Sequence, residues 1–182
     1  MAPPNHKPVW AGHALLAPRL RFQLEWVVGS ILDVGCGEEP VEFMGDVVRL
    51  DLEPQRTDDL FVQADAGCLP FCDRSFDTVV LGDILEHVPD PAAVVREAAR
   101  VAAYRIVATI MEELRLPKWG YNTPDPAISG HCWKFKDEDI GWMIRQNAPH
   151  FWPREFRKQY ECTHKGWPWY EWLICAERRG QC

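Results

Sequence analysis

The stretch ILDVGCG at residues 31–37 decides the fold expected for this chain of 182 residues. Its first four residues are apolar apart from Asp33, which is typical of a short buried strand. Gly35 and Gly37 follow at once, and glycine lacks the Cβ atom that keeps a ligand away from the backbone. A buried strand that runs into a glycine loop predicts a parallel α/β sheet with a ligand site at the carboxyl end of that strand.

Further strands and helices are predicted on both sides of this stretch. Helical spacing of apolar residues covers residues 14–28, Pro91–Val101 with Asp90 as its cap, and Asp137–Asn147. Apolar β-rich runs cover residues 30–34, 47–50, 60–63, 76–81 and 104–110, and two more runs at 154–162 and 169–177 flank a turn around Gly166. We therefore expect one domain with a doubly wound, mostly parallel seven-stranded α/β sheet that carries an antiparallel C-terminal strand pair.

Acidic residues and glycines follow the predicted strands at the points where these strands end. Asp51 ends the second strand, Asp65 follows the third, and Gly82 and Asp83 end the fourth. Asp51 lies 18 residues after Asp33. This is close to the offset of about 20 residues at which an acidic side chain binds a ribose diol. Asp65 can accept a hydrogen bond from the amine of an adenine. The pattern predicts an adenosine site at one edge of the sheet.

The glycine loop indicates which kind of adenosine cofactor this site takes. GCGEEP at residues 35–40 lacks the third glycine of the dinucleotide fingerprint, and two glutamates stand where a pyrophosphate needs positive potential. A sulfonium cofactor carries a cation and no phosphate, so an acidic loop suits it. A nucleotide-dependent oxidoreductase is the alternative that this loop disfavours.

Residues 31–100 resemble the class I S-adenosylmethionine-dependent methyltransferases of the small-molecule type. The resemblance rests on ILDVGCG at 31–37, RLDLEP at 49–54, ADAGCLPF at 64–71 and SFDTVVLGDILEHVPDP at 75–91. A looser likeness extends to GHCWKFKDEDI at 130–140, which is similar to a family segment with a histidine before the last helix. The resemblance implies a Rossmann-like fold and S-adenosylmethionine as the cofactor.

The resemblance also implies roles for individual residues. The cofactor-binding set is Asp33, Gly35 and Gly37 around the methionine part, Asp51 with Leu52 at the ribose, Asp65 with Ala66 at the adenine, and Gly82. For catalysis we expect His87 to act as the general base, with His131 as the second candidate for this role. Asp83 is expected to orient His87 or to contact the cofactor's amine. Trp119 and Tyr121 are expected as walls of the acceptor pocket.

Two segments depart from the family pattern. Only residues 38–46 separate the glycine loop from the second strand, whereas a parallel crossover normally needs a dozen or more residues. The first crossover helix is therefore expected to be shortened to about one turn or to be absent. Val101, Ala102 and Ala103 stand where the family has a Pro-Gly-Gly turn before the fifth strand.

Composition restricts the partners that we expect. The net charge is −7, and residues 31–153 carry 22 acidic against 11 basic side chains, so a nucleic acid is disfavoured and a small-molecule acceptor is favoured. The seven cysteines form no CxxC motif, no signal-peptide core or membrane-spanning run is visible, and a cytoplasmic protein is expected. Residues 1–12 are expected to be flexible, and residues 111–135 to cover the acceptor site.

Two alternatives stay open at this point. A cluster of Asp83, Glu86, His87 and His131 is similar to the metal site of some RNA 2′-O-methyltransferases, and carboxylates with imidazoles are adequate metal ligands. A non-catalytic relative that serves as a partner subunit is the second alternative. The preferred interpretation needs no metal.

Overall fold

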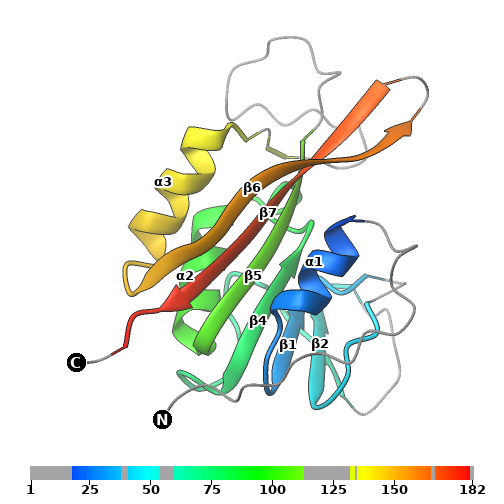
Figure 1. The fold of residues 1–182 in the computed structure, drawn as a ribbon. Coiled ribbons are helices and arrows are strands. Elements are labelled where there is room, and N and C mark those ends of the chain that lie inside the picture. The colour runs from blue at the N-terminus through cyan, green and yellow to red at the C-terminus, as the bar shows by residue number, and fades with distance from the viewer. Residues whose placement is uncertain are drawn as a thin grey trace.

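The computed structural model describes residues 18–37, 41–53, 60–112, 132–133, 135–164 and 167–180, which form helices beside a single sheet (Figure 1). The helices in these ranges are α1 (Pro18–Trp26), α2 (Pro91–Val101) and α3 (Asp137–Asn147). The strands are β1 (Ile31–Val34), β2 (Val47–Asp51), β3 (Phe61–Gln63), β4 (Phe76–Gly82), β5 (Ala102–Glu112), β6 (Phe151–His164) and β7 (Trp167–Arg178).

The sheet has seven strands in the order β3-β2-β1-β4-β5-β7-β6. The strands β1 to β5 pair in parallel with their neighbours, whereas β7 is antiparallel to both β5 and β6. The strand order reverses at β1, which lies between β2 and β4, and α/β sheets bind ligands at such a reversal. The predicted fold class, including the antiparallel C-terminal pair, is confirmed.

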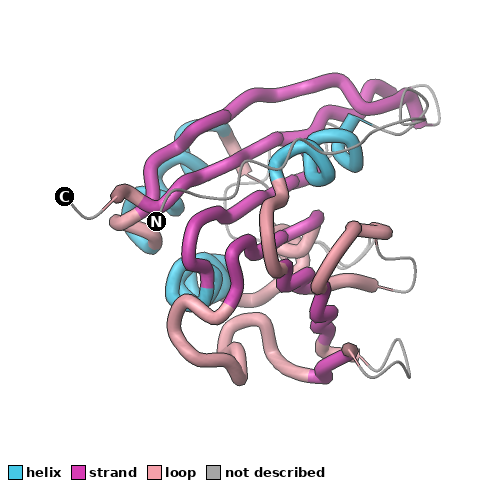
Figure 2. The backbone as a smooth tube through the Cα atoms, turned by 60° about the horizontal axis from the view of Figure 1, so that its bottom comes forward, coloured by secondary structure: helices cyan, strands magenta, loops and turns pink. Residues whose placement is uncertain are grey.

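Helices pack on both faces of the sheet, as the two views in Figures 1 and 2 show. On one face, Phe22 and Leu24 of α1 pack over apolar side chains of β1, β2, β4, β5 and β7. On the other face, α2 and α3 bury residues such as Val94 and Ile140 against the second set of sheet side chains. Among the described residues, no helix is long and apolar enough to cross a membrane.

The helix α2 has the predicted bounds because its sequence signals are local. The Asp90 side chain accepts a hydrogen bond from the Ala93 N–H at 3.0 Å, and Pro91 occupies the first helical position, where a missing N–H costs nothing. Val94, Val95 and Ala98 form its buried face. The helix runs directly into β5 at Ala102, so no separate turn replaces the Pro-Gly-Gly of the family pattern.

The helix α1 ends at Trp26, two residues before the predicted end. The Thr78 side chain of β4 explains the difference, because its Oγ1 accepts from the Val28 N–H at 3.0 Å and donates to the Val28 carbonyl at 2.8 Å. These bonds hold Val28 to the sheet, and Gly29 follows with a positive φ of 61°. The predicted helix start at residue 14 lies outside the described residues.

The connection from β1 to β2 contains no helix within its described residues, 35–37 and 41–46. The side chain of Phe43 is buried instead, in the core on the α1 face of the sheet. A loop therefore covers part of the face that a crossover helix would cover, because the connection is too short for a full helix. The expectation of a shortened or missing first crossover helix agrees with this arrangement.

The last strands are longer than predicted. β6 begins at Phe151, three residues early, and it includes Pro153, where its register with β7 shifts. Proline is tolerated on an edge strand or at a bulge because no ladder hydrogen bond is lost there, so the expected start after Pro153 was wrong. β5 extends to Glu112 by pairing with Tyr170, which places the first two residues of the predicted 111–135 cover in the sheet.

Candidate functional site

A pocket of about 390 Å³ lies where β1 to β4 end. This volume is within the range of small-molecule sites. Seven residues of the predicted site line it: Gly35, Asp51, Leu52, Asp65, Ala66, Asp83 and His87. The predicted residues Asp33, Gly37 and Gly82 are close to this lining in the chain but do not belong to it. The structure thus brings most of the predicted site together at one edge of the sheet.

The glycine loop after β1 is fixed by hydrogen bonds to β2. The Gly35 N–H donates to the Leu50 carbonyl at 2.7 Å, and the Gly37 N–H donates to Asp51 Oδ2 at 2.9 Å. Both glycines have a positive φ, 73° and 62°, which disfavours any residue with a Cβ atom. A Cβ at Gly35 would also lie 2.6 Å from Ile84 Cδ1, so only glycine fits between β1 and the pocket wall.

Two acidic side chains of the pocket are oriented by backbone amides. Asp51 is half-buried, and its Oδ1 accepts from the Glu53 N–H at 3.1 Å in addition to the Gly37 bond. Asp65 is exposed, and its Oδ1 accepts from the Gly67 N–H at 2.7 Å. Each carboxylate oxygen has two lone pairs, so both side chains keep acceptor capacity for a ligand.

Asp33 is a buried acid next to this loop. Burial raises the pKa of its carboxyl to about 7, against the lowering effect of Arg49, while Asp51 adds to the rise. Within the described part of the chain, its Oδ2 atom has no hydrogen-bond partner. A buried acceptor without a partner is costly, so this position suits a ligand group that donates hydrogen bonds.

Asp83 is held by residues that sequence reasoning missed. It forms an ion pair with Arg19 of α1, and its Oδ1 accepts from Thr109 Oγ1 of β5 at 2.8 Å. Gln23 of α1 donates in turn to Thr109 Oγ1 at 3.1 Å. These contacts join residues 26 to 86 positions apart in the chain, so no local pattern reveals them. Asp83 is therefore anchored from two elements while it lines the pocket.

The loop that carries His87 is tied to β5 and to residues 132–133. Glu86 is fully buried, its Oε1 accepts from the Met111 N–H at 2.9 Å, and burial raises its pKa to about 7. The Glu86 carbonyl accepts from the Cys132 N–H at 2.6 Å, and Trp133 Nε1 donates to the Val88 carbonyl at 2.7 Å. His87 itself is exposed and lines the pocket.

Some predicted site features remain outside this arrangement. His131, Trp119 and Tyr121 lie outside the described residues. In the part of the chain that the structure describes, no three His, Cys, Asp or Glu side chains gather as metal ligands. The five lining residues that were not predicted are the apolar Leu50, Ala64, Ile84, Val88 and Pro89, and an apolar residue near a strand end gives no signal that separates a pocket wall from the core.

Comparisons with known proteins agree with the site and the fold. Residues 32–104 match the family model described as a methyltransferase domain. A ubiquinone biosynthesis O-methyltransferase from Xanthomonas euvesicatoria pv. vesicatoria is 33% identical over 108 residues, which cover 48% of this chain and 45% of that relative. The matched region thus spans less than half the length of this curated relative.

Solved structures share the fold over most of the chain. A S-adenosylmethionine-dependent methyltransferase from Methanosarcina mazei has a TM-score of 0.63 at 20% identity and covers 90% of this chain and 98% of its own. Magnesium protoporphyrin IX methyltransferase from Synechocystis, solved with bound S-adenosylmethionine, has a TM-score of 0.58 at 17% identity, over 82% of this chain and 70% of its own. The match of residues 32–104 and the strand order thus identify a methyltransferase domain with the fold of the class I S-adenosylmethionine-dependent methyltransferases.

Proposed function

We propose that this protein transfers a methyl group from S-adenosylmethionine to a small-molecule acceptor. The observation that carries the proposal is the pocket at the ends of β1 to β4, where Gly35, Asp51 and Asp65 lie together with His87. The methyltransferase domain implies S-adenosylmethionine as the methyl donor. The pocket supplies acceptors for its adenosine part and a candidate base beside them.

The residues around the pocket fit this cofactor. The buried Oδ2 of Asp33 has no partner among the described residues, and an ammonium group such as that of the methionine part would supply one. Among the described residues, nothing lies within 4 Å of a Cβ built at Gly37, which leaves room for a ligand beside the backbone. We assign Asp51 with Leu52 to the ribose, and Asp65 with Ala66 to the adenine edge.

When bound, S-adenosylmethionine supplies a methyl group that its sulfonium already activates. The protein then contributes mainly alignment of the acceptor with that methyl group. For a hydroxyl acceptor, His87 removes the proton through a ring nitrogen and releases it to solvent, to which its side chain is exposed. Asp83 is already bonded to Arg19 and Thr109, so we give it a positioning role.

Two observations favour a small acceptor. The relatives reported above are named for ubiquinone biosynthesis and for magnesium protoporphyrin IX. The net charge of −7 repels a phosphate backbone. Because the curated relative is an O-methyltransferase, hydroxyl compounds are the first acceptors to try.

Calorimetry with S-adenosylmethionine, followed by a labelled-methyl transfer assay on phenols, quinols and tetrapyrroles, tests the proposal. Asp51→Ala should weaken cofactor binding by about 1–3 kcal/mol, because the ligand's hydroxyls lose their acceptor. Asp73→Ala removes an exposed acid away from the pocket and serves as the control. No binding by the wild type would favour a non-catalytic partner subunit.

The metal-assisted alternative is tested by adding a chelator to the same assay. Glu86 is buried and its Oε1 is bonded to the Met111 amide, while Asp83 is ion-paired, so both carboxylates already have protein partners. We expect methyl transfer to continue in the chelator. Activity that is lost and then restored by magnesium or manganese would favour a metal site that includes His131.

A further inference from the structure

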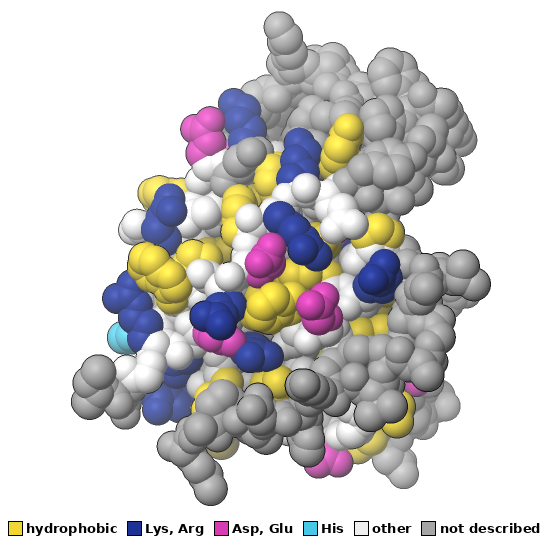
Figure 3. All heavy atoms as spheres, viewed as in Figure 1, with side chains coloured by type: hydrophobic (Ala, Val, Ile, Leu, Met, Phe, Trp, Pro, Cys, Tyr) yellow, Lys and Arg dark blue, Asp and Glu magenta, His cyan; other side chains and the backbone are white. Residues whose placement is uncertain are grey.

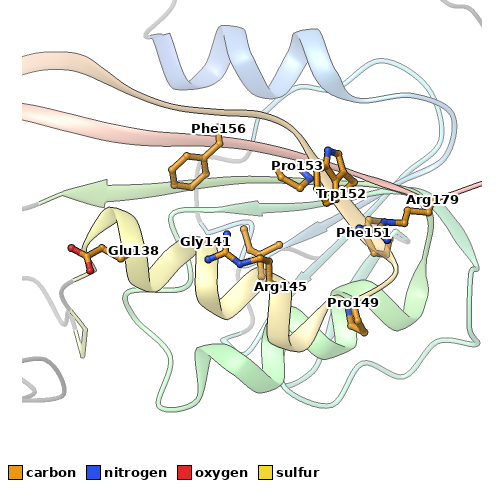
Figure 4. Close-up of a pocket in the computed structure, with 10 residues that line it drawn as sticks. Glu138, Gly141, Arg145, Pro149, Phe151, Trp152, Pro153, Phe156 and Arg179 are labelled. Atoms are coloured by element: carbon orange, nitrogen blue, oxygen red, sulfur yellow. The ribbon is translucent and has the colours of Figure 1, made fainter.

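A second pocket, of about 730 Å³, lies between α3 and β6 (Figure 4). It shares no lining residue with the pocket at the ends of β1 to β4. Ile144, Phe151 and Phe156 supply apolar walls, and Phe156 stacks on Trp172 with ring centroids 5.7 Å apart. The methyl-transfer proposal gives this pocket no role.

One glycine helps to keep the pocket open. Gly141 lies on α3 and lines the pocket, where the described atom nearest to an added Cβ would belong to the Arg145 guanidinium, at 3.6 Å. That distance is an ordinary contact. Glycine in a helix interior costs about 1 kcal/mol relative to alanine, so a larger residue at this position would favour the helix while it filled the space.

Two cations lie at the same pocket. Arg145 and Arg179 both line it, and neither guanidinium has an acidic partner among the described residues. Arg179 lies over the Trp152 ring, with its guanidinium carbon 4.8 Å from the centroid. The one acid in the lining, Glu138, is in the first turn of α3, three residues before Gly141, beside which the Arg145 guanidinium lies. The lining therefore combines apolar walls with two guanidiniums and one carboxylate.

We propose that this pocket binds a small anionic amphiphile, a molecule with an apolar body and a single carboxylate. The body lies against Ile144 and Phe156, and the carboxylate pairs with the Arg145 guanidinium. Unpaired guanidiniums beside an apolar surface favour an anionic head over a neutral or cationic one.

Calorimetry with sodium decanoate, decanol and decylamine tests the proposal, since these probes share an apolar chain and differ in the head group. Decanoate should bind most tightly. Arg145→Ala should weaken decanoate binding by about fivefold or more, as expected for a lost charge-assisted hydrogen bond. Gly141→Leu should abolish it by filling the pocket. Arg154→Ala removes an exposed arginine of β6 that does not line the pocket, and it should bind like the wild type.

Several outcomes would overturn the proposal. Decanol that binds as tightly as decanoate would show that the arginines do not select the head group. Binding that survives Gly141→Leu would place the probe elsewhere, and S-adenosylmethionine affinity of the same variant shows that it is folded. A wild-type dimer that Gly141→Leu separates on light scattering would instead make this pocket an interface between copies. Binding only to vesicles of anionic lipid would indicate a membrane surface.

Discussion

Gly35 and Gly37 share a left-handed backbone conformation but have different surroundings. A Cβ at Gly35 would lie 2.6 Å from Ile84, whereas no atom of the described residues lies within 4 Å of a Cβ at Gly37. The first glycine is required by both conformation and space, the second by conformation alone. Ile84 in turn lines the pocket, so a residue that pushes it would also change the binding site.

We expect Gly35→Ala to lower the free energy of unfolding by about 2–5 kcal/mol, from backbone strain and overpacking together. Gly37→Ala should cost about 1–2 kcal/mol, because only the strain applies. Urea unfolding of both variants measures the difference. Equal losses would mean that Ile84 moves aside and that packing does not require glycine at position 35.

His87 is the exposed imidazole of the pocket, and we expect it to act in the transfer step. His87→Ala should keep its affinity for S-adenosylmethionine and lose roughly 10²–10⁴-fold in turnover on a hydroxyl acceptor, the usual contribution of a general base. Stopped assays under single-turnover conditions measure the rate, and added imidazole should restore part of it.

His150→Ala is the matched control, because His150 is exposed and does not line the pocket. It should turn over like the wild type. If His87→Ala also turns over normally on the true acceptor, His87 is not the general base. The base is then His131, or the protein acts only by aligning the acceptor with the methyl group.

Local sequence signals predicted the elements whose ends depend on local contacts. Apolar runs gave β1 to β4 to within one residue, and the Asp90 cap with Pro91 gave α2. The end of α1 could not be predicted, because it depends on Thr78, 50 residues away from Val28. The start of β6 was predicted after Pro153, although proline is compatible with the edge strand that β6 forms.

The same difference between local signals and contacts of distant residues applies to the candidate site. Gly35, Asp51 and Asp65 were predicted because each follows a recognisable strand end. The anchors of Asp83 were not, because Arg19 and Thr109 belong to other elements. A hydrogen bond between distant residues leaves no periodic trace in the sequence.

Thr109 connects three elements through its hydroxyl, since it accepts from Gln23 of α1 and donates to Asp83 after β4. Thr109→Val keeps the shape and leaves both partners without this bond. It should lower the free energy of unfolding by about 1–3 kcal/mol. Because Asp83 lines the pocket, affinity for S-adenosylmethionine should fall as well, which calorimetry measures.

Thr78→Val provides the comparison. Thr78 is equally buried and bonds Val28 at the opposite end of β4 from the pocket. It should lose a similar amount of stability with unchanged cofactor affinity. A cofactor affinity that falls equally in both variants would mean that general destabilisation, and not the Asp83 anchor, is responsible.

At the scale of the whole molecule, the negative net charge is not spread evenly. On the face drawn in Figure 3, basic side chains lie among acidic and apolar ones over β6, β7 and α1. Three cations of β5 and β6 have partners: Arg157 lies over the Phe22 ring, Arg105 pairs with Glu177, and Arg154 approaches Glu177 at 3.9 Å. Arg157 also lies 3.7 Å from Glu155, so each of the three has an acidic neighbour within the fold, although Arg105 and Arg154 share Glu177.

Two buried acids make the stability of the molecule depend on pH in an unusual direction. Burial raises the pKa values of Asp33 and Glu86 to about 7, from 3.8 and 4.5. The folded state then binds more protons than the unfolded state between these limits. Each group therefore lowers the free energy of unfolding as pH rises through this window, by up to about 1.4 kcal/mol per pH unit.

Glu97 has the opposite sign. Its hydrogen bond from Arg100 lowers its pKa, so the stability that it contributes is present at neutral pH and is lost as pH falls through its folded pKa. Glu97 and the two buried acids have opposite effects on how the free energy of unfolding of the wild type changes with pH. Single variants of Glu86 and Glu97 separate these effects.

Glu86→Gln should resemble the protonated form of Glu86, because the amide oxygen can still accept from the Met111 N–H. We expect this variant to unfold like the wild type at about pH 4, below the unfolded pKa of Glu86, and to be more stable than the wild type at about pH 8 by one or more kcal/mol. Urea unfolding across this range measures the difference. Glu97→Gln should show the reverse trend, less stable than the wild type at about pH 8 with a gap that narrows towards acid. If Glu86→Gln is instead less stable at every pH, the wild-type carboxylate is charged and stabilised in place, and the buried acid does not set the pH dependence.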